Sequence, residues 1–218
     1  MKKKLNYLLI MPRLIQNLGD GYSFPLGIAY ISSSMKKAGF NVRTINLNHR
    51  KGEVLEIIKE EIEANKTDVI ATGGLSFQYS TVKNIVEAAK RADNKIITIV
   101  GGGIITGDPE PAMEALEYAD IGVIGEGEVT VNQLSNALEN GEKLSGINGI
   151  IFKRNNGYVA TGKRKEIEDI DALPWPDYSG FQIEEYLRST PPGISGLNRK
   201  NTIFMLASRS CPYNCTFC

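Results

Sequence analysis

The three cysteines of this 218-residue chain are Cys211, Cys215 and Cys218, and their spacing is C-x3-C-x2-C. They follow an apolar run, Thr202 to Ala207, that we expect to form a buried strand. Three thiolates on a tight loop after a strand can each bind one iron of a 4Fe-4S cluster. The fourth iron would then have no protein ligand from this loop and would be open to a small molecule.

Two other interpretations of the cysteines compete with the cluster. A zinc site more often combines C-x2-C pairs with a fourth Cys or His. Three incidental core cysteines are the second alternative, whereas disulfides conflict with the odd number and the close spacing of the thiols. The spacing favours the iron–sulfur cluster.

The stretch from Ser208 to Cys218, SRSCPYNCTFC, also has an aromatic residue directly before its last cysteine. It resembles the cluster loop of the radical S-adenosylmethionine (SAM) superfamily, in which the open iron chelates SAM. The resemblance implies Cys211, Cys215 and Cys218 as metal ligands, and a 4Fe-4S cluster and SAM as cofactors. A complete barrel of that superfamily is longer than the stretch present, so we expect the front part of a longer protein.

Bulk composition indicates a globular α/β protein, with 42% apolar residues and 22 glycines. Lys plus Arg and Asp plus Glu balance at 25 each, so we expect neither nucleic acid nor an anionic membrane as partner. The apolar start, Leu5 to Met11, is too short for a transmembrane helix, and Pro12-Arg13 ends it without a cleavage site. We expect a cytoplasmic protein.

Strand and helix patterns alternate over roughly the first two thirds of the chain. The expected strands are Leu5–Met11, Asn41–Leu47, Asp68–Thr72, Lys95–Val100 and Ile121–Ile124. The expected helices are Pro25–Gly39, Glu53–Ala64, Ser80–Ala92, Pro109–Tyr118 and Val129–Leu138. Such alternation implies a parallel sheet with right-handed crossovers. We predict a flavodoxin-like (Rossmann-like), doubly wound, five-stranded sheet of order 2-1-3-4-5, with a ligand at the carboxyl ends of the strands.

The pattern changes after Asn140-Gly141. Gly149 to Thr161 is typical of a β-hairpin with Asn156-Gly157 at its turn, and the proline-containing Lys163 to Ser179 of an extended linker. A short helix is expected at Glu184 to Arg188. These patterns divide the chain into a ligand-binding domain (1–142), a hairpin and linker (143–200) and the first strand of a truncated radical SAM barrel (201–218).

Three strand ends have a high glycine content, at Thr72 to Tyr79, Val100 to Gly107 and Gly125 to Glu128. Glycine lets the backbone approach a bulky ligand and exposes N–H groups, although such glycines can also serve only tight βα turns. Because all three loops fall at one sheet edge, a ligand crevice is favoured. A dinucleotide is not favoured, because no phosphate-binding fingerprint follows the first strand.

Several motifs occur in a fixed order: Pro25 to Ile31, Val100 to Gly103, Gly125 to Glu128, Leu173 to Pro176, and the cysteine loop. The set resembles the N-terminal half of radical SAM proteins with a cobalamin (B12)-binding domain, which include methyltransferases and the anaerobic cyclase of chlorophyll biosynthesis.

This resemblance implies cobalamin over the strand ends. Tyr22 would approach the corrin ring, Ser76 and the triple glycine would line the nucleotide tail, and the Gly-Glu-Gly loop would close the pocket. The predicted cofactor contacts are Tyr22, Gly73, Gly74, Ser76, Gly101, Gly102, Gly103, Gly125, Glu126 and Gly127.

The single histidine tests the analogy. Cobalamin domains of the methionine synthase type carry a D-x-H-x-x-G histidine after the first strand as the lower axial ligand. Here His49 precedes Gly52 at that spacing, but Leu47 replaces the aspartate and the segment follows the second strand. We predict that His49 is a surface loop residue and that cobalamin binds without a histidine ligand.

Three other side chains have simple structural interpretations. Trp175 is expected to pack the linker onto a domain. Glu126 and Glu128 could form a general acid/base pair. We prefer the interpretation that they lie at a helix N-terminus, where the helix dipole favours carboxylates.

The function implied by the resemblance is that of a cobalamin-dependent radical SAM enzyme, with methyl transfer or related radical chemistry at a small-molecule substrate and an electron donor as partner. The chain by itself is expected to be inactive. Two alternatives remain: a cobalamin carrier or sensor module, and a radical SAM enzyme whose front domain no longer binds cobalamin. A methylthiotransferase is disfavoured because residues 1–210 contain no cysteine.

Overall fold

Seven strands form one sheet in the order β2-β1-β3-β4-β5-β6-β7 in the computed structural model, which describes residues 3–17, 20–155, 157–188, 203–209, 211, 213, 215 and 216. The strands are β1 (Asn6–Met11), β2 (Asn41–Asn46), β3 (Val69–Gly73), β4 (Ile97–Gly101), β5 (Ile121–Val123), β6 (Ile150–Arg154) and β7 (Gly157–Ala160). Strands β1 to β5 are parallel. The predicted doubly wound order 2-1-3-4-5 of the five parallel strands is confirmed, but the sheet has seven strands instead of the predicted five.

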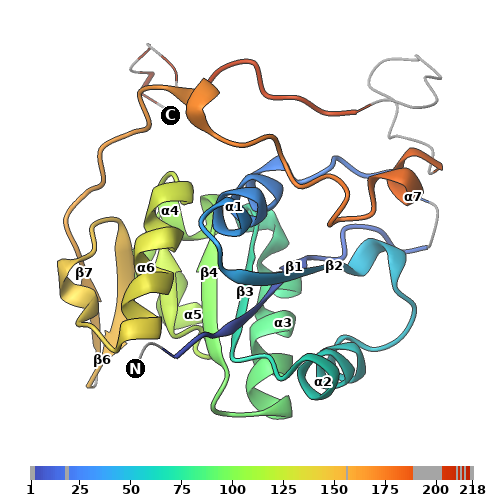
Figure 1. Ribbon diagram of the computed structural model, residues 1–218, viewed down its shortest axis with the longest axis horizontal. Coiled ribbons are helices and arrows are strands. Elements are labelled where there is room, and N and C mark those ends of the chain that lie inside the picture. Colours follow the sequence, from blue (N-terminus) through green and yellow to red (C-terminus); the bar gives the residue numbers. More distant parts are fainter. Residues whose placement is uncertain are drawn as a thin grey trace.

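The hairpin β6–β7 extends this sheet instead of standing apart from it. Strand β6 pairs antiparallel with β5, with Val123 opposite Ile150. Figure 1 shows the hairpin at one edge of the molecule and α2 at the other. The turn lies one residue earlier than predicted, because Arg154 already pairs with Gly157 and Asn155 has a φ of 54°.

Helices cover both faces of the sheet (Figure 1). They are α1 (Leu26–Lys37), α2 (Val54–Asn65), α3 (Tyr79–Ala92), α4 (Gly103–Thr106), α5 (Pro109–Ala115), α6 (Glu128–Asn140) and α7 (Ile183–Arg188). Short 3₁₀ turns occur at Leu47–His49, Ser76–Gln78, Leu144–Gly146 and Ile170–Ala172. The expected helices are confirmed to within a few residues, whereas α4 was not predicted.

The strand β1 shows why two layers of helices are needed. Its residues Tyr7, Leu9 and Met11 pack with α1 and α6, whereas Leu8 and Ile10 pack with α2 and α3. All five are at most 1% exposed. A strand buried on both faces has a continuous apolar sequence, which is what the first segment of the chain shows.

The segment after the hairpin returns across α1. The Asp177 N–H donates to the Ala29 carbonyl at 3.0 Å, and the Asp177 carboxylate accepts from Ser32 Oγ at 2.5 Å and Lys36 Nζ at 2.6 Å. Burial raises the pKa of Asp177, but the hydrogen bonds from Lys36 and Ser32 outweigh it and leave the pKa below its usual value. The segment is irregular in conformation, as predicted, but is fastened to α1.

Two expectations about the later segment are wrong. Residues 203–209 do not form a strand, and Met205 is 63% exposed, because no described strand lies beside this segment to pair with it. Trp175 is 74% exposed and does not pack onto the domain.

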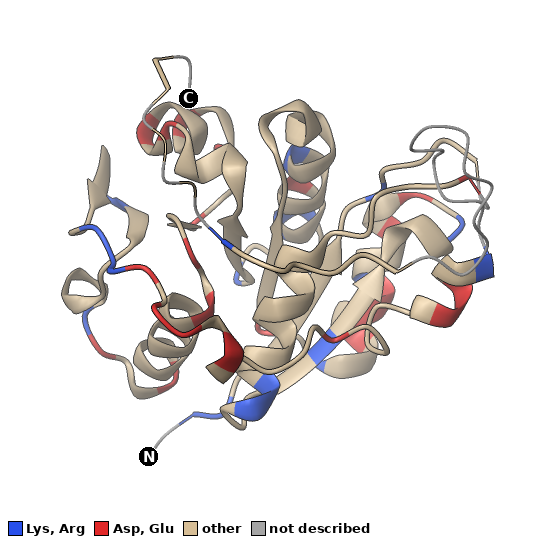
Figure 2. Cartoon of the chain, turned by 90° about the horizontal axis from the view of Figure 1, so that it is seen from above, with Lys and Arg blue, Asp and Glu red and all other residues tan. Residues whose placement is uncertain are grey.

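Charge is mixed over the surface. Figure 2 shows Lys and Arg residues interspersed with Asp and Glu residues along the described chain. Among the residues that the structure describes, no helix combines the length and the apolar character needed to cross a membrane.

Candidate functional site

A cavity of about 1280 Å³ lies at the carboxyl ends of the parallel strands. Its floor is apolar and comes from the strands themselves, with Leu9 of β1, Ala71 of β3, Ile99 of β4 and Val123 of β5. This is the point where the chain leaves β1 for one side of the sheet and β3 for the other, which is where ligands bind in open α/β sheets. The predicted position of the ligand site is therefore matched by a cavity.

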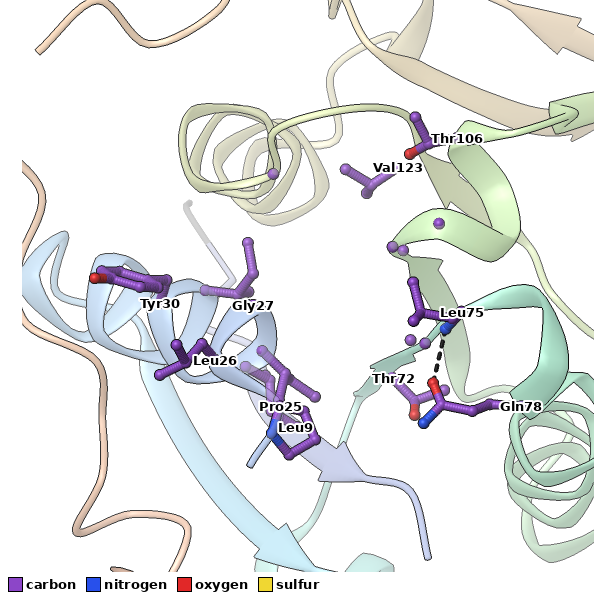
Figure 3. Close-up of a pocket in the computed structure, with 18 of the residues that line it drawn as sticks. Leu9, Pro25, Leu26, Gly27, Tyr30, Thr72, Leu75, Gln78, Thr106 and Val123 are labelled. Atoms are coloured by element: carbon purple, nitrogen blue, oxygen red, sulfur yellow. Dashed lines mark hydrogen bonds between the residues drawn. The ribbon is translucent and has the colours of Figure 1, made fainter. Parts of the chain in front are cut away.

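Two walls face each other across the cavity. Figure 3 shows Pro25, Leu26 and Gly27 of the α1 region on one side, with Leu75 on the other. Leu75 is 55% exposed although it is apolar, and its N–H donates to Gln78 Oε1 at 2.7 Å. Leu75 therefore presents an apolar surface to the cavity.

The glycines after β3 and β4 let two loops cross closely. A Cβ on Gly73 would lie 2.4 Å from the Gly101 carbonyl oxygen, and one on Gly102 would lie 2.7 Å from that of Gly74. The Gly74 N–H donates to the Gly101 carbonyl at 3.2 Å, and Gly102 has a φ of +88°. These glycines are required by the fold as well as lining the cavity.

Two other glycines have a different environment. A Cβ on Gly27, in the first turn of α1, or on Gly125, after β5, would meet no heavy atom within 4 Å. Both residues line the cavity. Alanine forms helices better than glycine does, so helix formation does not explain a glycine at position 27. The open space beside Gly27 is part of the cavity and is not filled by neighbouring side chains.

The third wall carries charge. Arg209 donates from Nη2 to Glu128 Oε1 at 2.5 Å and from Nη1 to Glu126 Oε1 at 3.3 Å, and its guanidinium lies 5.0 Å from the centre of the Tyr30 ring. Burial lowers the pKa of Arg209, but the two carboxylates outweigh it and raise the pKa above its usual value. Glu128 is the first residue of α6, which agrees with its predicted place at a helix N-terminus.

Tyr22 and His49 form a buried polar contact beside the cavity. The Tyr22 hydroxyl accepts from Asn46 Nδ2 at 2.7 Å and lies 3.1 Å from His49 Nε2. His49 Nδ1 lies 3.3 Å from Gln182 Oε1 and 3.9 Å from Glu185 Oε2. Burial raises the pKa of Tyr22 and lowers that of His49.

The prediction that His49 is a surface loop residue is wrong. Its side chain is only 6% exposed, because the segment around Gln182 packs over it. His49 is not among the residues that line the cavity, and both ring nitrogens have protein partners.

Most of the predicted contact residues line the cavity, and only Ser76 of the set does not. Those that line it are Tyr22, Gly73, Gly74, Gly101, Gly102, Gly103, Gly125, Glu126 and Gly127. Ser76 lies on an exposed 3₁₀ turn outside the lining.

The cysteines lie apart from this set. Cys211 and Cys215 are exposed, whereas Cys218 lies outside the described residues. The described residues alone contain no group of three His, Cys, Asp or Glu side chains arranged to hold a metal. The metal-ligand assignment of the three cysteines therefore stays a prediction.

Sequence reasoning did not assign the α1 wall, Leu75 or Arg209 to the site, although all of them line the cavity. A glycine in the first turn of a helix was the available signal for Gly27. Arg209 gave none, because its partners lie 81 and 83 residues away in the sequence.

Comparisons with known proteins agree with this geometry. A family model described as "B12 binding domain" matches residues 18–135. An uncharacterised methyltransferase of Pyrococcus horikoshii is 28% identical over 227 residues, which cover 99% of this chain and 45% of the relative. The anaerobic magnesium-protoporphyrin IX monomethyl ester cyclase of Rubrivivax gelatinosus is 26% identical over 199 residues, which cover 89% and 34%. The chain thus spans less than half the length of these relatives.

Solved structures support the fold. The cobalamin-dependent S-adenosylmethionine radical enzyme OxsB with aqua-cobalamin matches with a TM-score of 0.68 and 22% identity, over 84% of this chain and 26% of that one. The radical S-adenosylmethionine methyltransferase TsrM of Kitasatospora setae, with cobalamin and a 4Fe-4S cluster bound, matches with a TM-score of 0.66 and 17% identity, over 85% and 38%.

Proposed function

This chain belongs to the B12-binding domain family, and from that premise we propose that the cavity over the carboxyl ends of β1, β3, β4 and β5 binds cobalamin. The observation that carries the proposal is a cavity of about 1280 Å³ with an apolar floor and glycine backbone along its edge. Pockets for drug-sized ligands occupy roughly 300–1000 Å³, so this cavity suits a larger molecule.

The residues present fit such a cofactor. The apolar floor, with Leu9, Ala71 and Val123, would lie under the face of a macrocycle, and apolar contact is the main source of affinity in pockets of this kind. The open space at Gly27 and Gly125 would leave room for the macrocycle's edge. The loops that contain Gly73, Gly74 and Gly101 to Gly103 would hold the nucleotide tail.

We further propose that no histidine of this chain binds the cobalt. The chain has one histidine, and His49 does not line the cavity and has both ring nitrogens in contact with protein groups. A His49→Gln variant should therefore retain cobalamin with an unchanged visible spectrum, whereas an axial imidazole would produce a clear spectral shift on its removal.

For the whole protein we propose a cobalamin-dependent radical SAM enzyme that performs methyl transfer or related radical chemistry on a small-molecule substrate. A separate electron donor would supply its electrons. The C-x3-C-x2-C motif and the named relatives support this proposal. Cobalamin, the cluster and SAM would supply the chemistry. The part of this chain would be to bind and orient cobalamin and to carry Cys211, Cys215 and Cys218 as cluster ligands.

The test is an anaerobic titration of the 218-residue chain with hydroxocobalamin, followed by desalting and a visible spectrum. We expect one equivalent to be retained. A variant with all three cysteines replaced by serine should retain cobalamin equally but should lose the iron and sulfide that reconstitution adds to the unmodified chain.

Each part of the proposal can fail separately. Loss of cobalamin on desalting, from a chain shown to be folded by circular dichroism, would refute the cofactor assignment and favour a front domain that only shields the substrate. Equal iron content in the chain and in its triple serine variant would refute the cluster assignment.

A further inference from the structure

The segment that leads into the cysteine motif lies against the cobalamin cavity. Leu206, Ser208 and Arg209 line it together with residues of the domain that precede them by 75 positions or more. Figure 1 shows this segment, coloured red, running across the molecule above α1. The backbone of residues 203–209 forms no helix or strand, so side-chain contacts must hold its position.

Arg209 makes the strongest of these contacts. Its guanidinium bonds to Glu126 and Glu128 at once and stacks over Tyr30, and its side chain is 17% exposed. The Tyr178 hydroxyl also donates to the Phe204 carbonyl of this segment, at 2.6 Å.

The two glutamates are themselves fixed. The Glu128 side chain is 4% exposed in the first turn of α6, where the helix dipole favours a carboxylate. Glu126 accepts from the Ile167 N–H at 2.6 Å through its other oxygen. Exposed ion pairs contribute little to stability, but a planar guanidinium held between two fixed carboxylates defines a position and an orientation.

We propose that Arg209 is a positioning residue that fixes the start of the cysteine motif relative to the cobalamin cavity, through Glu126 and Glu128. Two residues of chain span at most roughly 7 Å, so a fixed Arg209 confines Cys211 to a small region beside the cavity mouth. The loop from Gly125 to Glu128 lines the cavity and holds Arg209, so one loop sets both positions. The purpose of this contact rests on the proposed function. The effect of Arg209 on the position of Cys211 can nevertheless be tested without cobalamin.

The test measures a distance between two spin labels by pulsed electron paramagnetic resonance. One label is attached to Cys211 and the other to a Glu110→Cys substitution on the exposed surface of α5, with Cys215→Ser and Cys218→Ser to prevent other labelling. We expect one narrow distance peak in this parent variant, because Arg209 confines the labelled cysteine.

Variants of Arg209 and Glu128 test which groups of the ion-pair contact are needed. Arg209→Ala should lose the narrow peak, and Arg209→Lys should broaden it, because lysine keeps the charge but lacks the planar fork. Glu128→Gln should broaden it as well. Arg43→Ala, at an exposed position of β2, and Glu63→Gln, at an exposed position of α2, are matched controls that should leave the peak unchanged.

A narrow peak that persists in Arg209→Ala would overturn the proposal, and so would an equal broadening in Arg43→Ala. If Arg209→Ala does not fold, Arg209→Lys and Glu128→Gln carry the same test. Cobalamin retention by the parent variant is measured in parallel. Loss of retention with a narrow peak would refute the proposed function alone, whereas retention with a peak insensitive to Arg209 would refute this inference alone.

Discussion

Substitution of Gly27 by leucine separates ligand binding from folding more sharply than any other change in the cavity. Gly27 is the second residue of α1, and a Cβ there would meet no heavy atom within 4 Å. The new side chain would enter the space that we assign to cobalamin. Because even the Cβ meets no protein atom, we expect the substitution to affect the bound cofactor more than the empty fold.

The expected magnitudes follow from these surroundings. Leucine is a good helix former and glycine a poor one, so the free energy of unfolding should stay the same or rise by up to about 1 kcal/mol. Forcing a side chain into space that is already filled costs typically about 1–3 kcal/mol. Since 1.4 kcal/mol is a tenfold change in affinity, the Kd for cobalamin should weaken roughly 5- to 150-fold.

The assay is an anaerobic hydroxocobalamin titration together with urea unfolding of the same samples. Gly146→Leu is the matched control, because Gly146 also has open space around it but does not line the cavity. An unchanged Kd in Gly27→Leu would mean that the ligand does not lie against α1. An equal loss of affinity in both variants would mean that the effect is not local, and the reasoning from the cavity would be wrong.

Three further substitutions test the fold around the site. Gly102→Ala should lower the free energy of unfolding by more than about 1–2 kcal/mol, measured by urea, because φ is +88° and the new Cβ would lie 2.7 Å from the Gly74 carbonyl oxygen. Asp177→Asn should cost about 2 kcal/mol at pH 7, since it removes the charge that accepts from Lys36, and the difference should shrink as pH falls through the lowered pKa of Asp177. His49→Gln should flatten the stability profile below pH 6.5, because burial lowers the histidine pKa in the folded chain, so that acid stabilises the unfolded state; equal slopes in both proteins would contradict this.

Local patterns were sufficient to predict the parallel sheet. Strands such as β1 are almost entirely apolar, the helices between them have a buried face, and their order along the chain admits few topologies. The hairpin was equally visible, because Asn156-Gly157 is a typical turn sequence, although in the structure Gly157 already pairs with Arg154. Its pairing with β5 was not predicted, because the contact of Val123 with Ile150 depends on tertiary packing and leaves no local signal.

The errors have the same origin. His49 lies in a polar stretch that is typical of a surface loop, yet a segment 133 residues later covers it. Trp175, between two prolines, was expected to pack the linker onto a domain, yet it is 74% exposed. In both cases burial is decided by a partner distant in sequence, so neither residue's neighbours contain the information.

The glycines predicted for the site line the cavity for a mixed reason. A run such as Gly101 to Gly103 looks the same in sequence whether a ligand or a neighbouring loop requires it. The structure separates the cases, because a Cβ on Gly73 would collide with backbone at 2.4 Å while one on Gly27 would project into open space. The two causes are nevertheless linked: the close crossing of the β3 and β4 loops brings their backbone to the edge of the cavity, where a cofactor tail would lie. A glycine-rich strand end is therefore strong support for a loop crossing and only indirect support for a ligand, and we expect the ligand beside the isolated Gly27 in the first turn of α1, where a Cβ would meet open space within the cavity.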